Sequence, residues 1–128
     1  MNLRIGAVCS GIGGLELGLE RAQLGHTTFQ VERDAFRRCV LQRHWPDVPR
    51  FRDVRTVRKA DLPPIDVLCG GFPCQSLSAA GKRQGFGTPN APTRSGLYFE
   101  VERLIDEFQP RYLVLENVAH TWRSWVPF

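Results

Sequence analysis

The sequence predicts a doubly wound α/β fold built on a mostly parallel sheet. Short apolar runs recur along the chain, and stretches with apolar residues at helical spacing separate them. Several of the runs are followed directly by glycines or by an acidic residue. Open α/β sheets bind their ligands at the carboxyl ends of the strands. We therefore expect these glycine-rich and acidic segments to share one crevice.

The composition suits a single domain. With 128 residues, of which 42% are hydrophobic, the chain can form one globular core. A net charge of +4 permits nucleic-acid binding without requiring it. Basic residues are dense between Arg33 and Lys59. A solvated helix face explains such a run more often than a DNA contact surface does.

The cysteines indicate neither a metal centre nor a disulfide framework. Cys9, Cys39, Cys69 and Cys74 are scattered, without a C-x-x-C pair or a histidine at ligand spacing. The sequence shows no signal peptide, transmembrane run or lipidation motif. We therefore expect a cytoplasmic protein with reduced thiols and no metal site.

The first element is a strand over residues 3–9, which runs into the glycine-rich turn of residues 10–14. Leu15, Leu19 and Ala22 then recur at helical spacing, so the turn should open a helix. Glycines let a ligand lie against the backbone, and the first amides of a helix attract its anionic groups. The pattern predicts a nucleotide-type cofactor, although many α/β proteins use such a turn for packing alone.

The glycine pattern argues against a nicotinamide cofactor. A dinucleotide-binding fingerprint requires G-x-G-x-x-G. Here Gly13 is followed directly by Gly14, and Glu16 stands where the third glycine should be. A nicotinamide-dependent oxidoreductase is therefore disfavoured.

A second strand is expected over residues 27–32, ending in Glu32. A carboxylate at this place can accept hydrogen bonds from both hydroxyls of a ribose. The alternative, a cap for the next helix, suits Asp34 better than Glu32.

The helix after Asp34 ends at Trp45-Pro46, and a short third strand with a linker follows it. The linker covers residues 61–64. The helix carries an apolar stripe that we expect to face the core. This stripe of the helix consists of Phe36, Cys39 and Val40. The third strand is expected over residues 51–54 and contains Asp53.

A fourth, buried strand is expected over residues 65–69, followed by a turn that presents Cys74. Gly70 and Gly71 should let the backbone turn sharply, and Pro73 fixes φ just before the thiol. Asp66, at the start of this strand, is expected to be structural. An isolated cysteine is more often buried and inert than reactive.

Residues 75–92 read as a long polar loop, which is functional or disordered in most proteins. A helix with a sheet-facing apolar stripe should follow and end before Pro110. A fifth buried strand, residues 112–115, then leads into Glu116. Burying a glutamate is expensive, which favours a functional role for it. The apolar stripe of the helix before Pro110 consists of Leu97, Val101, Leu104, Ile105 and Phe108.

The segment GGFPCQSLSAAGKRQGF around Cys74 resembles the catalytic motif of DNA (cytosine-5) methyltransferases, and further motifs of that family follow in its order. The glycine turn resembles their S-adenosylmethionine loop, and Glu116-Asn117-Val118 resembles their second catalytic motif. The resemblance implies a Rossmann-like methyltransferase sheet, S-adenosylmethionine as cofactor and double-stranded DNA as substrate.

The resemblance also assigns roles to residues. It implies that Cys74 is the nucleophile and that Glu116 is the second catalytic residue. The residues that it places on the cofactor are Ser10, Gly11, Ile12, Gly13, Gly14, Leu15, Glu32, Arg33, Asp53, Val54, Gly71, Pro73 and Leu97. Those that it places near DNA are Gln75, Ser76, Ser78, Lys82 and Arg83.

The sequence departs from the family pattern in two respects. Cys9 stands where the family usually has a phenylalanine, and the resemblance covers residues 3–118 only. The Gln-x-Arg-x-Arg motif, the target-recognition domain and the last cofactor motif do not follow, and residues 119–128 form a non-matching tail. We expect an incomplete methyltransferase domain that is weak or inactive alone and that a second polypeptide could complete. The alternative is a non-catalytic fragment that binds S-adenosylmethionine or a partner.

Overall fold

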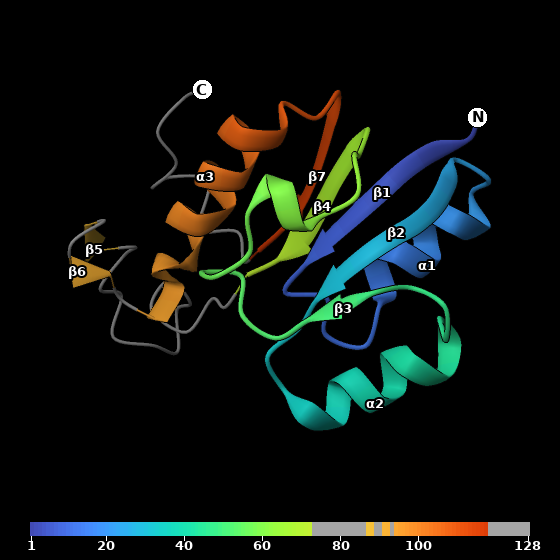
Figure 1. Ribbon diagram of the computed structural model, residues 1–128, viewed down its shortest axis with the longest axis horizontal. Coiled ribbons are helices and arrows are strands. Elements are labelled where there is room, and N and C mark those ends of the chain that lie inside the picture. The colour runs from blue at the N-terminus through green and yellow to red at the C-terminus, as the bar shows by residue number, and fades with distance from the viewer. Residues whose placement is uncertain (73–86, 89–90, 93, 118–128) are drawn as a thin grey trace.

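The computed structural model describes residues 1–72, 87–88, 91–92 and 94–117. Its main sheet has five parallel strands in the order β3-β2-β1-β4-β7, which confirms the predicted fold class (Figure 1). Residues 87–88 and 91–92 form a separate antiparallel pair, β5 and β6. The five strands are β1 (Leu3–Val8), β2 (Gly25–Val31), β3 (Arg50–Phe51), β4 (Val67–Gly71) and β7 (Tyr112–Glu116).

Within the described residues, three α-helices and two short 3₁₀ helices connect these strands. None of the helices in the described part of the chain has the length and apolar character needed to cross a bilayer. The α-helices are α1 (Gly14–Arg21), α2 (Ala35–His44) and α3 (Tyr98–Phe108), and the 3₁₀ helices are η1 (Lys59–Asp61) and η2 (Arg94–Leu97).

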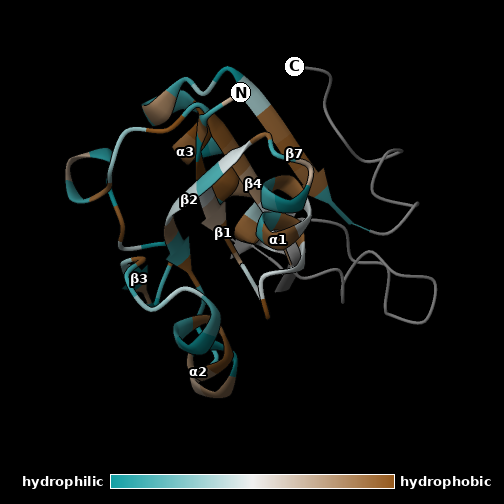
Figure 2. Ribbon diagram, turned by 90° about the vertical axis from the view of Figure 1, so that its right-hand side faces the viewer, coloured by the Kyte–Doolittle hydropathy of each residue, from teal (hydrophilic) through white to brown (hydrophobic). Residues whose placement is uncertain are grey.

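The sheet is covered on both faces, because alternate residues of β1 point in opposite directions. Ile5 and Ala7 are fully buried in a cluster that includes residues of α1. Val8 belongs to a larger cluster on the other face, which includes residues of α3. Figure 2 shows the corresponding hydrophobic colouring of the central strands and of α3. The doubly wound arrangement therefore follows from this alternation.

The predicted sheet-facing stripe of α3 is confirmed for three of its residues. Val101, Leu104 and Phe108 are buried, and the Phe108 ring lies 6.0 Å from the ring of Phe29 on β2. Gln109, in the left-handed conformation with φ 50°, ends the helix just before Pro110. The apolar spacing thus identified both the helix and the face that it buries.

The expectation that the stripe of α2 faces the core is wrong. Phe36 is 75% exposed, Cys39 is also exposed, and only Leu41 of this helix is buried. Figure 1 shows α2 below β3, at the edge of the sheet. Because β3 has only two residues, it offers little apolar surface for a helix to cover. Phe36 and Cys39 therefore face outward, and Val40 is only half-buried.

The expected turn at Gly70 and Gly71 is also wrong, because both glycines belong to β4. Gly70 pairs with Val8 and Leu115, and Gly71 pairs with Glu116. A Cβ atom at position 70 would lie 2.4 Å from the carbonyl oxygen of Val8. Glycine is needed here for close strand approach and not for a turn.

The prediction of a fifth buried strand is correct for the strand and wrong for its burial. Strand β7 lies at the edge of the described sheet, with β4 as its neighbour. Tyr112 is 46% exposed and Leu113 is 39% exposed, and Glu116 is exposed as well. An apolar run alone does not reveal whether the strand is central or lies at an edge.

Asp66 is structural, as expected, and its contacts predict a pH effect. Its carboxylate accepts hydrogen bonds from Arg4 Nε at 2.9 Å, Arg4 Nη2 at 3.0 Å and the Arg4 amide at 2.9 Å. These hydrogen bonds hold the pKa of Asp66 well below its usual range. The bonds from the Arg4 side chain have the larger effect, and the bond from the Arg4 amide has the smaller one. The stabilisation should therefore be present above about pH 4 and be lost as the pH falls further, through the folded-state pKa.

Thermal unfolding measured against pH checks this effect. Asp66→Asn should lower the melting temperature at neutral pH and flatten its decline in acid relative to the unmodified chain. Asp106→Asn, at an exposed position of α3, is the matched control. An acid limb that is equally steep in Asp66→Asn would contradict the assignment.

Candidate functional site

The carboxyl ends of the parallel strands bring most of the predicted site residues together. The glycine loop of residues 9–13 follows β1, and Glu32 follows β2 directly. Gly71 ends β4 and Glu116 ends β7, side by side in the strand register. The order of the strands reverses between β1 and β4, which is where such sheets form a crevice.

The glycine loop alternates between left-handed and ordinary backbone conformations. Cys9, Gly11 and Gly13 have φ of 51°, 59° and 88°. The Gly13 amide donates to the Ser10 carbonyl at 2.9 Å, and Gly13 is the N-cap residue of α1. A Cβ atom on Gly13 would lie 2.5 Å from the ring of Trp45. Both its φ and this contact therefore require glycine at position 13.

Glu32 fastens this loop to the end of β2. Its carboxylate is buried, and Oε2 accepts a hydrogen bond from the Gly11 amide at 2.7 Å. Its Oε1 accepts from the Asp34 amide at 2.8 Å. The sequence did not predict this structural role. A carboxylate oxygen can accept more than one hydrogen bond, so the role leaves capacity for a ligand.

Asp34, and not Glu32, caps α2, as expected. Its side chain accepts a hydrogen bond from the Arg37 amide at 2.9 Å. The neighbouring Arg33 is exposed. The structure does not place Arg33 among the described residues that line the cavity of the crevice.

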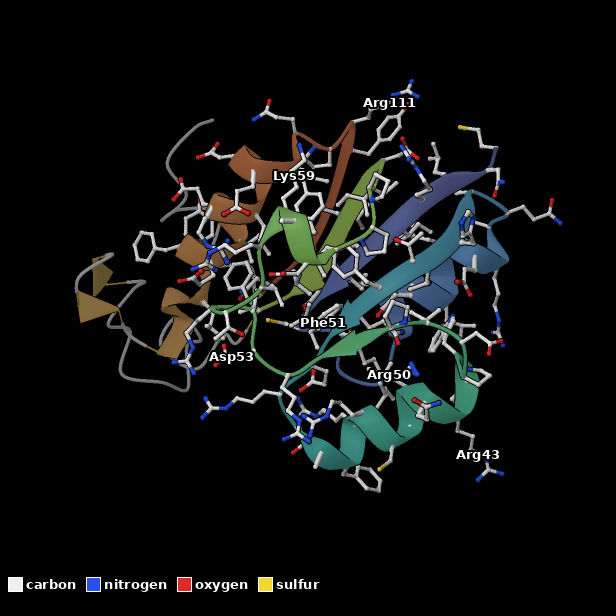
Figure 3. The ribbon with its side chains drawn as sticks, viewed as in Figure 1. Arg43, Arg50, Phe51, Asp53, Lys59 and Arg111 are labelled. Atoms are coloured by element: carbon white, nitrogen blue, oxygen red, sulfur yellow. The ribbon has the colours of Figure 1, made fainter. Side chains whose placement is uncertain are left out.

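Asp53 follows β3, beyond Phe51 (Figure 3), but its carboxylate is paired with Arg55. Arg55 Nη2 donates to Oδ2 at 2.7 Å, and the Arg55 amide donates to Oδ1 at 3.0 Å. The side-chain hydrogen bond from Arg55 is the largest cause of the lowered pKa of Asp53. Val54 is 5% exposed and belongs to the hydrophobic core. In this structure neither side chain is presented freely to a ligand.

Glu116 lies at the open end of the crevice. Its Oε2 lies 2.9 Å from the position that a Cβ atom on Gly71 would occupy. Asn117, the next residue, donates a hydrogen bond from Nδ2 to the Phe72 carbonyl at 3.2 Å. The expectation that Glu116 is buried at a high cost is wrong, because Glu116 is exposed. Its carboxylate is instead accessible to a substrate.

A cavity of about 240 Å³ occupies the crevice between the glycine loop and β4. Whole-ligand pockets are usually larger, about 300–1,000 Å³. Leu97 is half-buried against the core and does not line this cavity. Among residues 1–72 and 94–117, the lining includes two carboxylates and no cationic side chain; these lining residues are Cys9, Ser10, Ile12, Gly14, Leu15, Glu16, Gly70, Gly71 and Glu116.

The Cys9 thiol in this cavity is not a nucleophile at neutral pH. Burial, and secondarily the charge of Glu32, raises the pKa of Cys9 to about 12. The reactive form of a cysteine is the thiolate. Cys9 therefore acts as a small neutral side chain where the family usually has a phenylalanine.

Glu16 is a residue of this cavity whose role the sequence did not reveal. In the glycine pattern it marks only the place of a missing glycine, yet it belongs to α1 and is 1% exposed. Gln30 Nε2 donates to Glu16 Oε1 at 3.4 Å. Its position three residues before Leu19 is a signal that could have placed it on the sheet-facing side of the helix.

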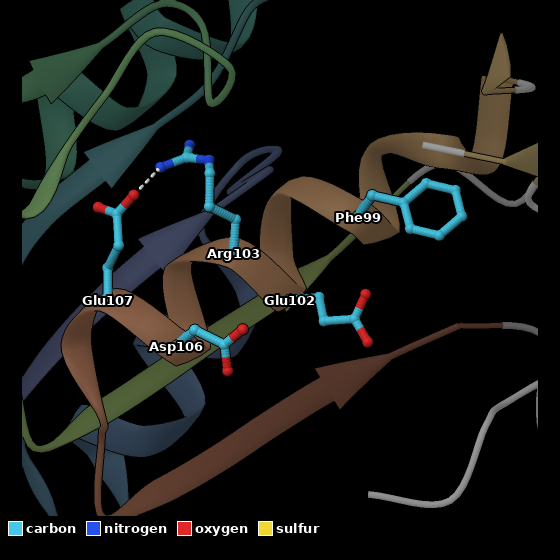
Figure 4. A pocket seen from close by; sticks show the side chains of 5 residues that line it. All are labelled: Phe99, Glu102, Arg103, Asp106 and Glu107. Carbon is cyan, nitrogen blue, oxygen red and sulfur yellow. Dashed lines mark hydrogen bonds and ion pairs between the residues drawn. The ribbon is translucent and has the colours of Figure 1, made fainter. Parts of the chain in front are cut away.

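In the described part of the chain, two larger cavities lie away from the glycine loop. One of about 430 Å³ lies on α3, where Arg103 is already paired with Glu107 at 2.7 Å (Figure 4). The other, of about 500 Å³, lies between α2 and β3 and includes Arg50. Arg50 Nη1 is held by the Trp45 carbonyl at 2.8 Å, while Arg43 projects from the end of α2 (Figure 3). Neither cavity meets the strand ends β1, β4 and β7.

Several predicted site residues lie outside the described residues. This group contains the predicted nucleophile and all the residues expected near DNA. Its members are Pro73, Cys74, Gln75, Ser76, Ser78, Lys82 and Arg83.

Known proteins share this sequence and fold. The family model of C-5 cytosine-specific DNA methylases matches residues 3–123. The type II methyltransferase M1.ScrFI of Lactococcus lactis subsp. cremoris is 38% identical over 111 residues, which cover 87% of this chain and 27% of the relative. For the type II methyltransferase M.Bsp6I of Bacillus sp. (strain RFL6), identity is 37% over 119 residues, with coverage of 92% and 36%.

The solved structures include the S. pombe Dnmt2 methyltransferase, with a TM-score of 0.73 and 20% identity. That alignment covers 96% of this chain and 38% of Dnmt2, and at such identity it supports the fold alone. The chain spans 27% and 36% of the length of the two curated relatives above. The match to the family model extends over nearly all of the chain. The chain belongs to the family of C-5 cytosine-specific DNA methylases.

Proposed function

We propose that the chain is the cofactor-binding and catalytic part of a DNA (cytosine-5) methyltransferase. In this proposal it uses S-adenosylmethionine to methylate C5 of a cytosine flipped out of double-stranded DNA. The observation that carries the proposal is the glycine loop, which the Glu32 carboxylate holds through the Gly11 amide at 2.7 Å. The loop faces the same cavity as Gly71 and Glu116.

The residues of the crevice fit this cofactor. Positions 11 and 14 have no atom within 4 Å of where a Cβ would lie, so their backbone is open to a ligand. The buried Ser10 Oγ has no hydrogen-bond partner within the described residues. The part of the cavity lining that the structure describes carries two carboxylates and no cationic side chain, which suits a positively charged molecule. The loop amides would hold the cofactor and Glu32 its ribose hydroxyls, and by resemblance Asp53 and Val54 would contact its adenine.

The proposed chemistry depends on two side chains. The cofactor supplies an electrophilic methyl group, but C5 of cytosine is too weak a nucleophile to react unaided. Addition of the Cys74 thiolate to C6 makes C5 nucleophilic, and this covalent step divides a difficult reaction into easier ones. Glu116 would hold N3 and the exocyclic amine and stabilise the charge that develops on the ring. The base must leave the duplex for Cys74 to reach C6.

Covalent trapping tests this function. The chain is mixed with S-adenosylmethionine and duplex DNA in which 5-fluorocytosine replaces cytosine in many sequence contexts. Fluorine cannot leave as the C5 proton does, so a denaturation-resistant protein–DNA adduct should accumulate. The adduct should be absent with Cys74→Ala, and Cys39→Ala, at an exposed cysteine of α2, is the matched control.

The outcomes separate three accounts. An adduct that Cys74→Ala abolishes supports catalysis by this chain. An adduct that forms only after addition of a second polypeptide with the Gln-x-Arg-x-Arg and recognition segments supports completion by a partner. Cofactor binding without any adduct under either condition contradicts the catalytic proposal and supports the non-catalytic alternative.

Glu116→Gln should slow adduct formation strongly without unfolding the chain. Loss of a positioned acid–base group lowers a rate by about 10²–10⁴-fold. Because Glu116 is exposed, the melting temperature should change little. The rate of adduct formation and thermal unfolding are measured together, with Glu102→Gln on α3 as the control. An adduct rate equal to that of the unmodified chain would rule out the proposed role.

A further inference from the structure

The charge of the crevice is unusual for a site beside a helix N-terminus. Such a site normally favours anions, because the backbone amides and the helix dipole are positive there. Here the nine lining residues that belong to the described part of the chain include Glu16 and Glu116 but no lysine, arginine or histidine. The cavity is therefore suited to a cationic group.

Glu16 is poorly compensated for a buried carboxylate. It is 1% exposed, and its contact with Gln30 is a long hydrogen bond of 3.4 Å. Gln30 cannot turn freely, because its carbonyl oxygen accepts from Arg50 Nη1 at 3.1 Å and directs the amide nitrogen toward Glu16. Ser10 lies near enough to favour the charged carboxylate, yet its buried Oγ makes no hydrogen bond of ordinary geometry within the described residues.

Burial of Glu16 has a measurable consequence for its titration. Burial is the largest cause that raises the pKa of Glu16, and the nearby Glu20 carboxylate adds to the shift. A buried acid is costly in the free protein, and here burial outweighs the hydrogen bonding of the Glu16 carboxylate to its own backbone amide, to Ser10 and to Gln30. A positive charge placed in the cavity would offset that cost.

We propose that Glu16 makes this site selective for a positively charged cofactor, so that S-adenosylmethionine binds in preference to S-adenosylhomocysteine. This inference rests on the proposed function. Both molecules carry the same amino acid and adenosine groups, but only the first has a sulfonium. Transfer of the methyl group leaves the sulfur neutral. The attraction of Glu16 is then lost, which favours product release.

The other carboxylates near the crevice are less suited to this role. Both oxygens of Glu32 accept hydrogen bonds from backbone amides. Glu20 accepts two hydrogen bonds from Thr27 and does not line the cavity. Glu116 is exposed, so water screens its charge. Glu16 combines burial, a place in the cavity wall and incomplete hydrogen bonding.

Calorimetric titration of the full chain tests the proposal. The probes are S-adenosylmethionine, S-adenosylhomocysteine and sinefungin, whose protonated amine replaces the methyl-sulfonium. Glu16→Gln keeps the shape of the side chain and removes its charge. Glu16→Asp restores the charge, and Glu20→Gln removes the same charge one turn further along α1. Thermal unfolding of every variant identifies those that fold.

Glu16→Gln should weaken binding of S-adenosylmethionine and sinefungin by roughly tenfold and leave binding of S-adenosylhomocysteine unchanged. Glu16→Asp should restore most of the preference, and Glu20→Gln should keep it. An equal loss for all three probes, or no loss, would overturn the inference, because Glu16 would then be only structural. If the unmodified chain binds none of the probes, the proposed function itself fails, and this inference fails with it.

Discussion

Gly70→Ala is expected to destabilise the chain by about 3 kcal/mol, the upper end of the range for overpacking a well-packed interior. A Cβ atom at this position would lie 2.4 Å from the Val8 carbonyl oxygen and 2.8 Å from Val8 Cγ2. The obstructing oxygen belongs to the backbone of β1, which pairs with β4 through Val8 and Gly70. The methyl group can be accommodated only if the two central strands move apart.

Gly18→Ala is the matched control for this substitution. Gly18 lies inside α1, has no atom within 4 Å of its Cβ position and does not have positive φ. Alanine should raise the free energy of unfolding by about 0.5–1 kcal/mol, because it has the higher helix propensity. Denaturant titration measures both variants. Gly70→Ala as stable as the unmodified chain would contradict the assignment of Gly70 to the strand.

Glu32→Gln is expected to have the largest effect on cofactor binding among the single substitutions of the crevice. The carboxylate accepts from the Gly11 and Asp34 amides at 2.7 and 2.8 Å. A glutamine has one acceptor oxygen, so its NH₂ group must face one of these N–H donors. A buried donor left without a partner costs about 1–3 kcal/mol, and the glycine loop should lose its fixed position.

The expected result for Glu32→Gln is a rise in the dissociation constant for S-adenosylmethionine of about a hundredfold, since two bonds to the ribose would weaken with the loop. Asp34→Ala is the control. It removes the helix cap of α2 and should cost about 1 kcal/mol of stability without changing cofactor affinity. Calorimetry and thermal unfolding separate the two effects. Equal cofactor affinity in Glu32→Gln and the unmodified chain would contradict the role of Glu32.

The elements that the sequence predicted well are those whose signals are local. The glycine loop after β1 and the helix α1 follow from adjacent residues, and the buried stripe of α3 follows from helical spacing. Glu32 and Gly71 reach the crevice because parallel strands end at one edge of the sheet. Sequence order alone was sufficient to predict that placement.

The errors concern features that depend on distant parts of the chain. The stripe that contains Phe36 has core-like spacing, but α2 lies at the sheet edge, where Phe36 is exposed. Gly70 was assigned to a turn, although the actual requirement for glycine is the nearby backbone of β1. The burial of Glu16 depends on the packing of α1 against β2, which includes Gln30. None of these contacts is encoded in neighbouring residues.

The central claim is that the cofactor binds in the small cavity beside the glycine loop. It does not bind in the larger cavity on α3 or in the one between α2 and β3. Amide hydrogen exchange of the chain with and without saturating S-adenosylmethionine measures this directly. We expect slower exchange in residues 9–15 and 30–34, with residues 35–43 of α2 and 99–107 of α3 unchanged. Protection confined to α2 and β3 or to α3, with the glycine loop unchanged, would contradict the account.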